Sequence, residues 1–174
     1  MTKDLHTAIY SAVFFKPHRI IEMWRDALAD KVVGMPAIPT DGTLHCNHMT
    51  IKFRPDSDHV CKLPLGGTTE MQVTGYAADD NCIALSVKYL RYGIASSNAV
   101  PHITLWTAEG TPPRYSNELL AEALVPIEDG PKIWGTTGFF SNKREVRYTY
   151  EDSIYGLSLI HISEPTRPER RGDG

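Results

Sequence analysis

Two histidine–threonine pairs have residue types and a spacing suited to acting on a phosphodiester. His48 and Thr50 lie in the segment LHCNHMTIKF, and His102 and Thr104 lie in AVPHITLW. Each histidine begins an apolar run that predicts a strand, and because side chains alternate along a strand, each pair shares one face. If the two strands are close together, we expect two imidazoles and two hydroxyls to line one cleft.

Cleavage of a phosphodiester needs a base that takes a proton from the attacking water and an acid that protonates the leaving oxygen. Histidine can play either part because its ordinary pKa is close to neutral pH. The hydroxyls of Thr50 and Thr104 can donate hydrogen bonds to the non-bridging oxygens as negative charge develops. This chemistry requires no metal and no cofactor, and the spacing alone does not assign acid and base between His48 and His102.

Three further residues are candidates for holding a substrate. Tyr10 lies on the first expected strand, and Lys52 comes just after the first motif. Trp106 alternates onto the face of His102, where its ring can stack on a nucleobase. Each of the three also has a purely structural interpretation, as packing for Tyr10 and Trp106 and as a solvated strand residue for Lys52.

The two motifs resemble those of the 2H phosphoesterases, a superfamily named for two His-x-Ser/Thr motifs. It includes bacterial 2′-5′ RNA ligase-like proteins and the cyclic phosphodiesterase domain of fungal tRNA ligase. The segment NAVPHITLWTAEGTPPRYSNELL, with proline before the histidine and Ser-Asn before an expected helix, resembles the second half of the tRNA-ligase-type members. Most of residues 7–150 can be laid on that pattern.

The order of expected elements predicts an α+β fold. After the first strand, Pro17 begins a helix with Ile20, Ile21, Trp24 and Leu28 at helical spacing, and Ser116 or Asn117 is a plausible N-cap for a second helix. Strands are expected over 8–15, around His48, over 70–79 and 82–90, around His102, and over 132–140 and 144–150. The elements recur in two roughly matching halves, so we expect a two-lobed 2H phosphoesterase-like fold, with two antiparallel sheets and outer helices around a central cleft.

The end of the chain looks different from the rest. LSLIHISEPTR, residues 157–167, resembles a translated transposon-type sequencing adapter. We therefore expect one domain over residues 1–156 and a non-native tail over residues 157–174, which is left out of fold and site reasoning.

Composition narrows the possible partners and the cell compartment. The formal net charge is −3 and no long basic block is present, which argues against a protein that tracks long duplex nucleic acid. The absence of a long apolar run and of a signal-peptide pattern predicts a cytoplasmic protein without a membrane partner. We expect a monomer that takes an RNA 3′ end or a cyclic nucleotide.

The cysteines and the first histidine cluster give little support to a metal site. Cys46, Cys61 and Cys82 are odd in number and lack a Cys-x-x-Cys spacing, so they predict reduced thiols rather than a zinc site. His45 and Cys46 lie near His48, but alternation sends these two to opposite faces if the strand already runs there. We therefore expect no metal.

Three functions remain open. The resemblance implies hydrolysis of the 2′,3′-cyclic phosphate of RNA ends or nucleotides. An alternative within the same superfamily is a phage-type anti-defence phosphodiesterase that degrades cyclic oligonucleotide signals. Outside catalysis, the chain could be a binding module for a nucleotide or an RNA end.

Overall fold

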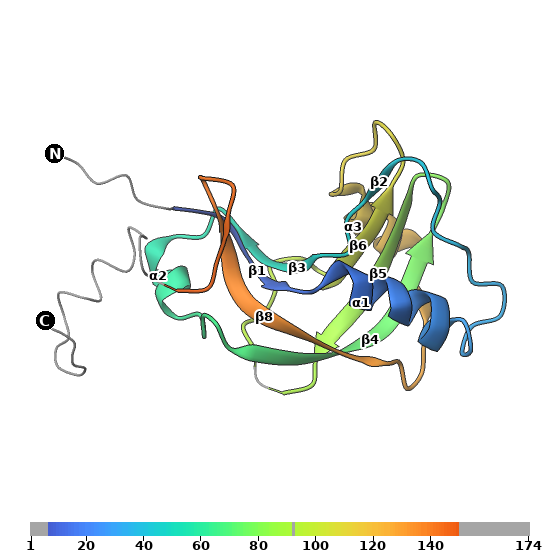
Figure 1. Ribbon diagram of the computed structural model, residues 1–174, viewed down its shortest axis with the longest axis horizontal. Coiled ribbons are helices and arrows are strands. Elements are labelled where there is room, and N and C mark those ends of the chain that lie inside the picture. Colours follow the sequence, from blue (N-terminus) through green and yellow to red (C-terminus); the bar gives the residue numbers. More distant parts are fainter. Residues whose placement is uncertain (1–6, 92, 150–174) are drawn as a thin grey trace, which may run out of the picture.

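The structure, a computed structural model, describes residues 7–91 and 93–149 and is built mainly from antiparallel strands (Figure 1). The six long strands are β1 (Ala8–Phe14), β3 (His48–Phe53), β4 (Thr68–Ala78), β5 (Cys82–Tyr89), β6 (His102–Thr107) and β8 (Lys132–Ser141). Three short strands complete the sheet, namely β2 (Thr43–Leu44), β7 (Val125–Pro126) and β9 (Val146–Arg147). The proposed domain end at Gly156 and the adapter-like tail lie outside the described residues.

The long strands close into a ring. Their order is β4-β5-β6-β3-β1-β8, and β8 pairs again with β4. β4 is long enough to serve two partners, because its first part, Thr68–Gln72, pairs with β8 and the part from Met71 onward pairs with β5. The short strands β2, β7 and β9 add to β6, β4 and β8, respectively.

This ring corrects the expected fold. The expectation of a two-lobed α+β fold, with two sheets and outer helices, is wrong because direct β3–β6 and β4–β8 pairing joins all strands into one sheet. The sequence indicated most strands but not their partners, since any of several antiparallel pairings satisfies the same alternation. The expected halves are therefore not separate layers.

The helices are short and cover only part of the sheet (Figure 1). They are α1 (Pro17–Glu22), the π-helical η1 (Met23–Leu28), α2 (Ser57–Cys61) and α3 (Tyr115–Ala123). The sequence did not predict a helix at α2. In the part of the chain that the structure describes, no helix is long and apolar enough to cross a bilayer.

The main hydrophobic core joins the inner face of the ring to α1 and η1. From the helices, Ile20, Trp24 and Leu28 pack into this core with exposed fractions of 2 % or less, as their spacing predicted. Trp24 donates its indole N–H to the carbonyl of Pro36 over 2.9 Å and meets Tyr76 edge to face. Trp24 is therefore a packing residue.

Candidate active site

The two motifs lie on neighbouring strands. Met49 of β3 and Ile103 of β6 are direct partners, and both are 0 % exposed because they point into the core. Successive side chains of a strand point to opposite faces, so the residues on either side of this pair lie on the other face of the sheet. Those residues are His48, Thr50, His102 and Thr104.

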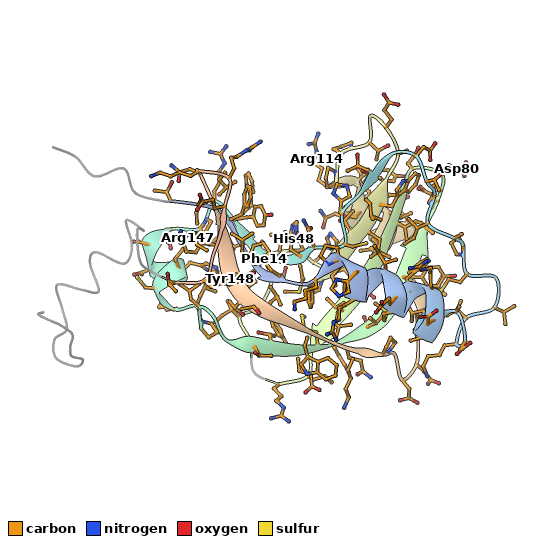
Figure 2. All side chains as sticks on the ribbon, viewed as in Figure 1. Phe14, His48, Asp80, Arg114, Arg147 and Tyr148 are labelled. Atoms are coloured by element: carbon orange, nitrogen blue, oxygen red, sulfur yellow. The ribbon has the colours of Figure 1, made fainter. Side chains whose placement is uncertain are left out.

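His48 lies among aromatic rings (Figure 2). The ring of Tyr10 stacks on His48 with centroids 4.8 Å apart, and the ring of Phe14 lies 6.0 Å away. Burial, helped by the nearby charges of His45 and His102, lowers the pKa of His48 to about 4. His48 is consequently neutral at pH 7.

The tautomer of His48 follows from its neighbour. Nδ1 lies 2.8 Å from Oδ1 of Asn47, and because an amide oxygen only accepts, Nδ1–H is the donor. In the neutral ring the other nitrogen, Nε2, then carries a lone pair. His48 has the protonation state of a general base.

His102 has the same tautomer but a different second contact. Its Nδ1–H donates to the carbonyl of Val100 over 2.7 Å, while Nε2 lies 2.8 Å from the hydroxyl of Ser116. Burial lowers the pKa of His102, against the hydrogen bond to Val100, which raises it. The side chain is only 7 % exposed. A hydroxyl of α3 therefore hydrogen-bonds Nε2, the ring nitrogen of His102 that the Val100 carbonyl does not contact.

Ser116 connects His102 with the second threonine. Its hydroxyl is 0 % exposed and also lies 3.1 Å from Oγ1 of Thr104 and 2.7 Å from the carbonyl of Pro113. The sequence suggested Ser116 only as a helix cap, whereas α3 begins at Tyr115 with Arg114 as its N-cap. No sequence pattern indicated this contact, because it depends on how α3 packs on β6.

Of the three proposed substrate-holding residues, the structure brings only Tyr10 to the histidines. A β-bulge separates Tyr10 from Lys52: Ser11 pairs with Lys52 but Ala12 pairs with Thr50, so Ile51 is the extra residue. Beyond a bulge the faces exchange, and Lys52 shares the face of Ser11. Consistently, burial and, after it, the charge of Lys52 lower the pKa of His59, whose Nε2 lies 2.8 Å from the hydroxyl of Ser11.

A second bulge moves Trp106 away from the site. Ile83 pairs with Trp106 while Ala84 pairs with Thr104, so Leu105 is the extra residue on β6. Trp106 is 4 % exposed, belongs to the main core, and donates its indole N–H to the carbonyl of Asp41. The structure therefore places it as a core aromatic.

Other neighbours of the site had no clear sequence signal. The ring of Phe140 stacks on Tyr10 at 5.3 Å from the neighbouring strand β8. Nε2 of His45 lies 3.0 Å from Oγ1 of Thr107, and burial lowers the pKa of His45.

The three cysteines are free thiols. Within residues 7–91 and 93–149, no three His, Cys, Asp or Glu side chains are arranged to hold a metal ion.

The candidate site has two imidazoles in the same tautomer and two threonines, all on one face of a closed antiparallel sheet. This arrangement is suited to cleaving a phosphodiester. Comparison with family models matches residues 43–138, more than half of the chain, to the fungal tRNA ligase phosphodiesterase domain. The chain belongs to this family, as its motifs predicted, and so to a class of phosphodiesterases. The matched range contains both motifs. A search of curated proteins found no match.

Proposed function

We propose that this protein hydrolyses 2′,3′-cyclic phosphates on RNA 3′ ends or nucleotides without a metal. The observation that carries the proposal is that His48 and His102 lie on one face of adjacent strands with Nδ1–H tied to an oxygen in both rings. In each ring Nε2 is thereby the nitrogen left to exchange a proton, and at His102 this nitrogen contacts the Ser116 hydroxyl in the free protein. Membership of a tRNA ligase domain family supports a substrate derived from RNA.

In the proposed step, water adds to phosphorus as one histidine takes its proton. The bond from phosphorus to one ribose oxygen breaks, and the other histidine gives that oxygen a proton. Cyclic phosphate and water thus become a phosphomonoester and a free hydroxyl. Donation from Thr50 and Thr104 stabilises the negative non-bridging oxygens where charge develops.

The two histidines need opposite protonation states for this step. Burial lowers the pKa of both, so both are neutral in the free protein at pH 7. A phosphodiester carries negative charge, which favours a protonated imidazole beside it. The substrate itself therefore supplies the charge that makes one histidine an acid.

The test is turnover of 2′,3′-cyclic AMP beside a 3′,3′-cyclic dinucleotide, each with and without excess EDTA. His48→Ala and His102→Ala should each lower the rate by about 100- to 10,000-fold, the usual contribution of general acid–base catalysis. His18→Ala is the matched control, because His18 is exposed on α1 and lies outside the site. Its rate should equal that of the wild type.

Each outcome is decisive for the proposal. Turnover of 2′,3′-cyclic AMP that depends on both histidines supports it. Turnover of the dinucleotide alone assigns the protein to signal degradation instead. Nucleotide binding without turnover of either compound makes it a binding module, and activity that EDTA abolishes contradicts the metal-independent step.

A further inference from the structure

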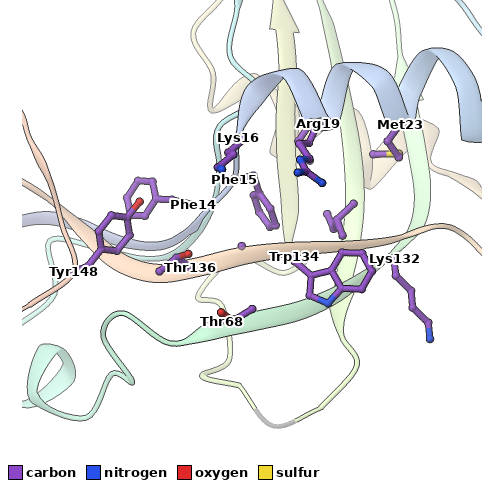
Figure 3. Close-up of a pocket in the computed structure, with 13 residues that line it drawn as sticks. Phe14, Phe15, Lys16, Arg19, Met23, Thr68, Lys132, Trp134, Thr136 and Tyr148 are labelled. Carbon is purple, nitrogen blue, oxygen red and sulfur yellow. The ribbon is translucent and has the colours of Figure 1, made fainter.

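A cavity of about 540 Å³ lies next to the candidate active site, between α1 and β8 (Figure 3). Its volume falls in the range of ordinary ligand sites. Phe14 and Tyr148 line one end, and their rings are 6.1 Å apart. The ring of Phe14 also lies 6.0 Å from that of His48, so a single side chain separates the cavity from the histidine.

The lining of this cavity is cationic. Lys16, Arg19 and Lys132 all contribute to it, and none of its described lining residues is acidic. The nearby Glu70, opposite Trp134 on β4, is not part of the lining and lies 3.7 Å from Arg91. Three cationic side chains line this one cavity although the whole chain has a net charge of −3. This local positive charge favours an anionic ligand.

The cavity also presents a flat aromatic surface. Trp134 is 59 % exposed although a tryptophan normally buries most of its area. Figure 3 shows its ring between Lys132 and the part of the cavity nearest Thr136. Exposed aromatic rings beside cationic side chains are the arrangement by which proteins hold single-stranded nucleic acid, with bases stacked and phosphates paired.

We propose that this cavity binds the single-stranded RNA segment on the 5′ side of the terminal phosphate. Trp134 stacks on a base, while Lys16, Arg19 and Lys132 contact the phosphates. This inference rests on the proposed function, which places the RNA end at His48. It adds that an RNA strand is a better substrate than a mononucleotide. Lys16 and Arg19 are far from Lys132 and Trp134 in the sequence, which is why no basic block indicated this cavity.

Binding can be tested without turnover, using a short fluorescein-labelled oligoadenylate that ends in a 3′-hydroxyl. Trp134→Ala should weaken its affinity by roughly 5- to 150-fold, the usual effect of losing one base–aromatic stack. Lys132→Gln should weaken binding and make it less salt-dependent, by about 0.7 in the slope of log affinity against log salt. Lys31→Gln is the matched control, since Lys31 is exposed and outside the cavity lining.

The same variants separate this proposal from the proposed function. Trp134→Ala and Lys132→Gln should lower kcat/KM for an oligoadenylate with a 2′,3′-cyclic phosphate by a much larger factor than kcat/KM for 2′,3′-cyclic AMP. If both variants bind the strand like wild type, the cavity proposal is wrong whatever the activity. If they lose binding but no cyclic phosphate is ever cleaved, the proposed function fails and the cavity stands.

An abasic strand of the same length distinguishes RNA recognition from general attraction of polyanions. The proposal requires the abasic strand to bind more weakly than the oligoadenylate and to be insensitive to Trp134→Ala. Equal affinity for both strands would show a plain cationic patch and overturn the role of Trp134. If circular dichroism shows that Trp134→Ala does not fold, Lys132→Gln is the variant that tests the proposal, because the side chain of Lys132 is exposed.

Discussion

The hydroxyl of Ser116 and Nε2 of His102 lie 2.8 Å apart. The carbonyl of Pro113 lies 2.7 Å from the same hydroxyl, which has one proton to donate. When His102 is neutral, Ser116 donates to Nε2; when Nε2 is protonated, Nε2–H donates to Ser116, which turns its proton to Pro113. The same heavy-atom positions thus serve both protonation states of His102.

Loss of this hydroxyl should destabilise the fold. Ser116→Ala leaves a buried imidazole nitrogen without its partner, and a buried unsatisfied group costs about 1–3 kcal/mol. Urea unfolding followed by circular dichroism measures the free energy of unfolding. Ser57→Ala, at an exposed serine of α2, is the control and should change it much less. Equal stability of Ser116→Ala and wild type would contradict the assigned hydrogen bond.

The low pKa of His48 makes stability depend on pH. Its folded-state pKa is about 4, whereas the unfolded chain has the ordinary value of 6.5. Between these values unfolding takes up a proton, so the free energy of unfolding falls as pH falls from 6.5 to 4, by at most about 1.4 kcal/mol per pH unit from this group.

Comparison with a variant isolates the contribution of His48. His48→Gln cannot bind the proton, so its stability should fall less steeply over the same pH range. The measurement is urea unfolding at several pH values, and the two slopes are compared rather than the absolute stabilities. Parallel curves for the two proteins would show that another group governs this range.

Tyr10 should control the pKa of His48 by excluding water. Its ring lies 4.8 Å from that of His48, and burial is the largest cause of the lowered pKa. Tyr10→Ala admits water and should raise the pKa of His48 toward 6.5, while Tyr10→Phe keeps the ring and should leave it low. Titration of the imidazole by NMR measures both, and no difference between the variants would refute the role of the ring.

Anion binding should raise the pKa of both histidines. A doubly charged anion near Nε2 stabilises the protonated ring electrostatically. Sulfate is a suitable probe because it has no proton of its own to exchange near neutral pH. NMR titration of His48 and His102 in sulfate, against chloride at equal ionic strength, should show the increase. Failure of both residues to respond would place the anion site elsewhere.

The sequence by itself determined the local elements and the family. Runs of apolar and β-branched residues predicted β1, β4, β5 and β8 within about two residues of their observed bounds. The two motifs indicated β3 and β6 but not where these strands end. The helical spacing of Ile20, Trp24 and Leu28 predicted the buried face of α1 and η1 in the same way. The two motifs led to a phosphodiesterase family, which the family comparison confirmed.

Only the tertiary structure decided which strands are neighbours and which way some side chains point. The pairing of Met49 with Ile103 brings the motifs together, and β4–β8 pairing closes one sheet where two were expected. Single-residue bulges at Ile51 and Leu105 turn Lys52 and Trp106 away from the histidines. Pairing and bulges depend on contacts between distant segments, and no local periodicity encodes them.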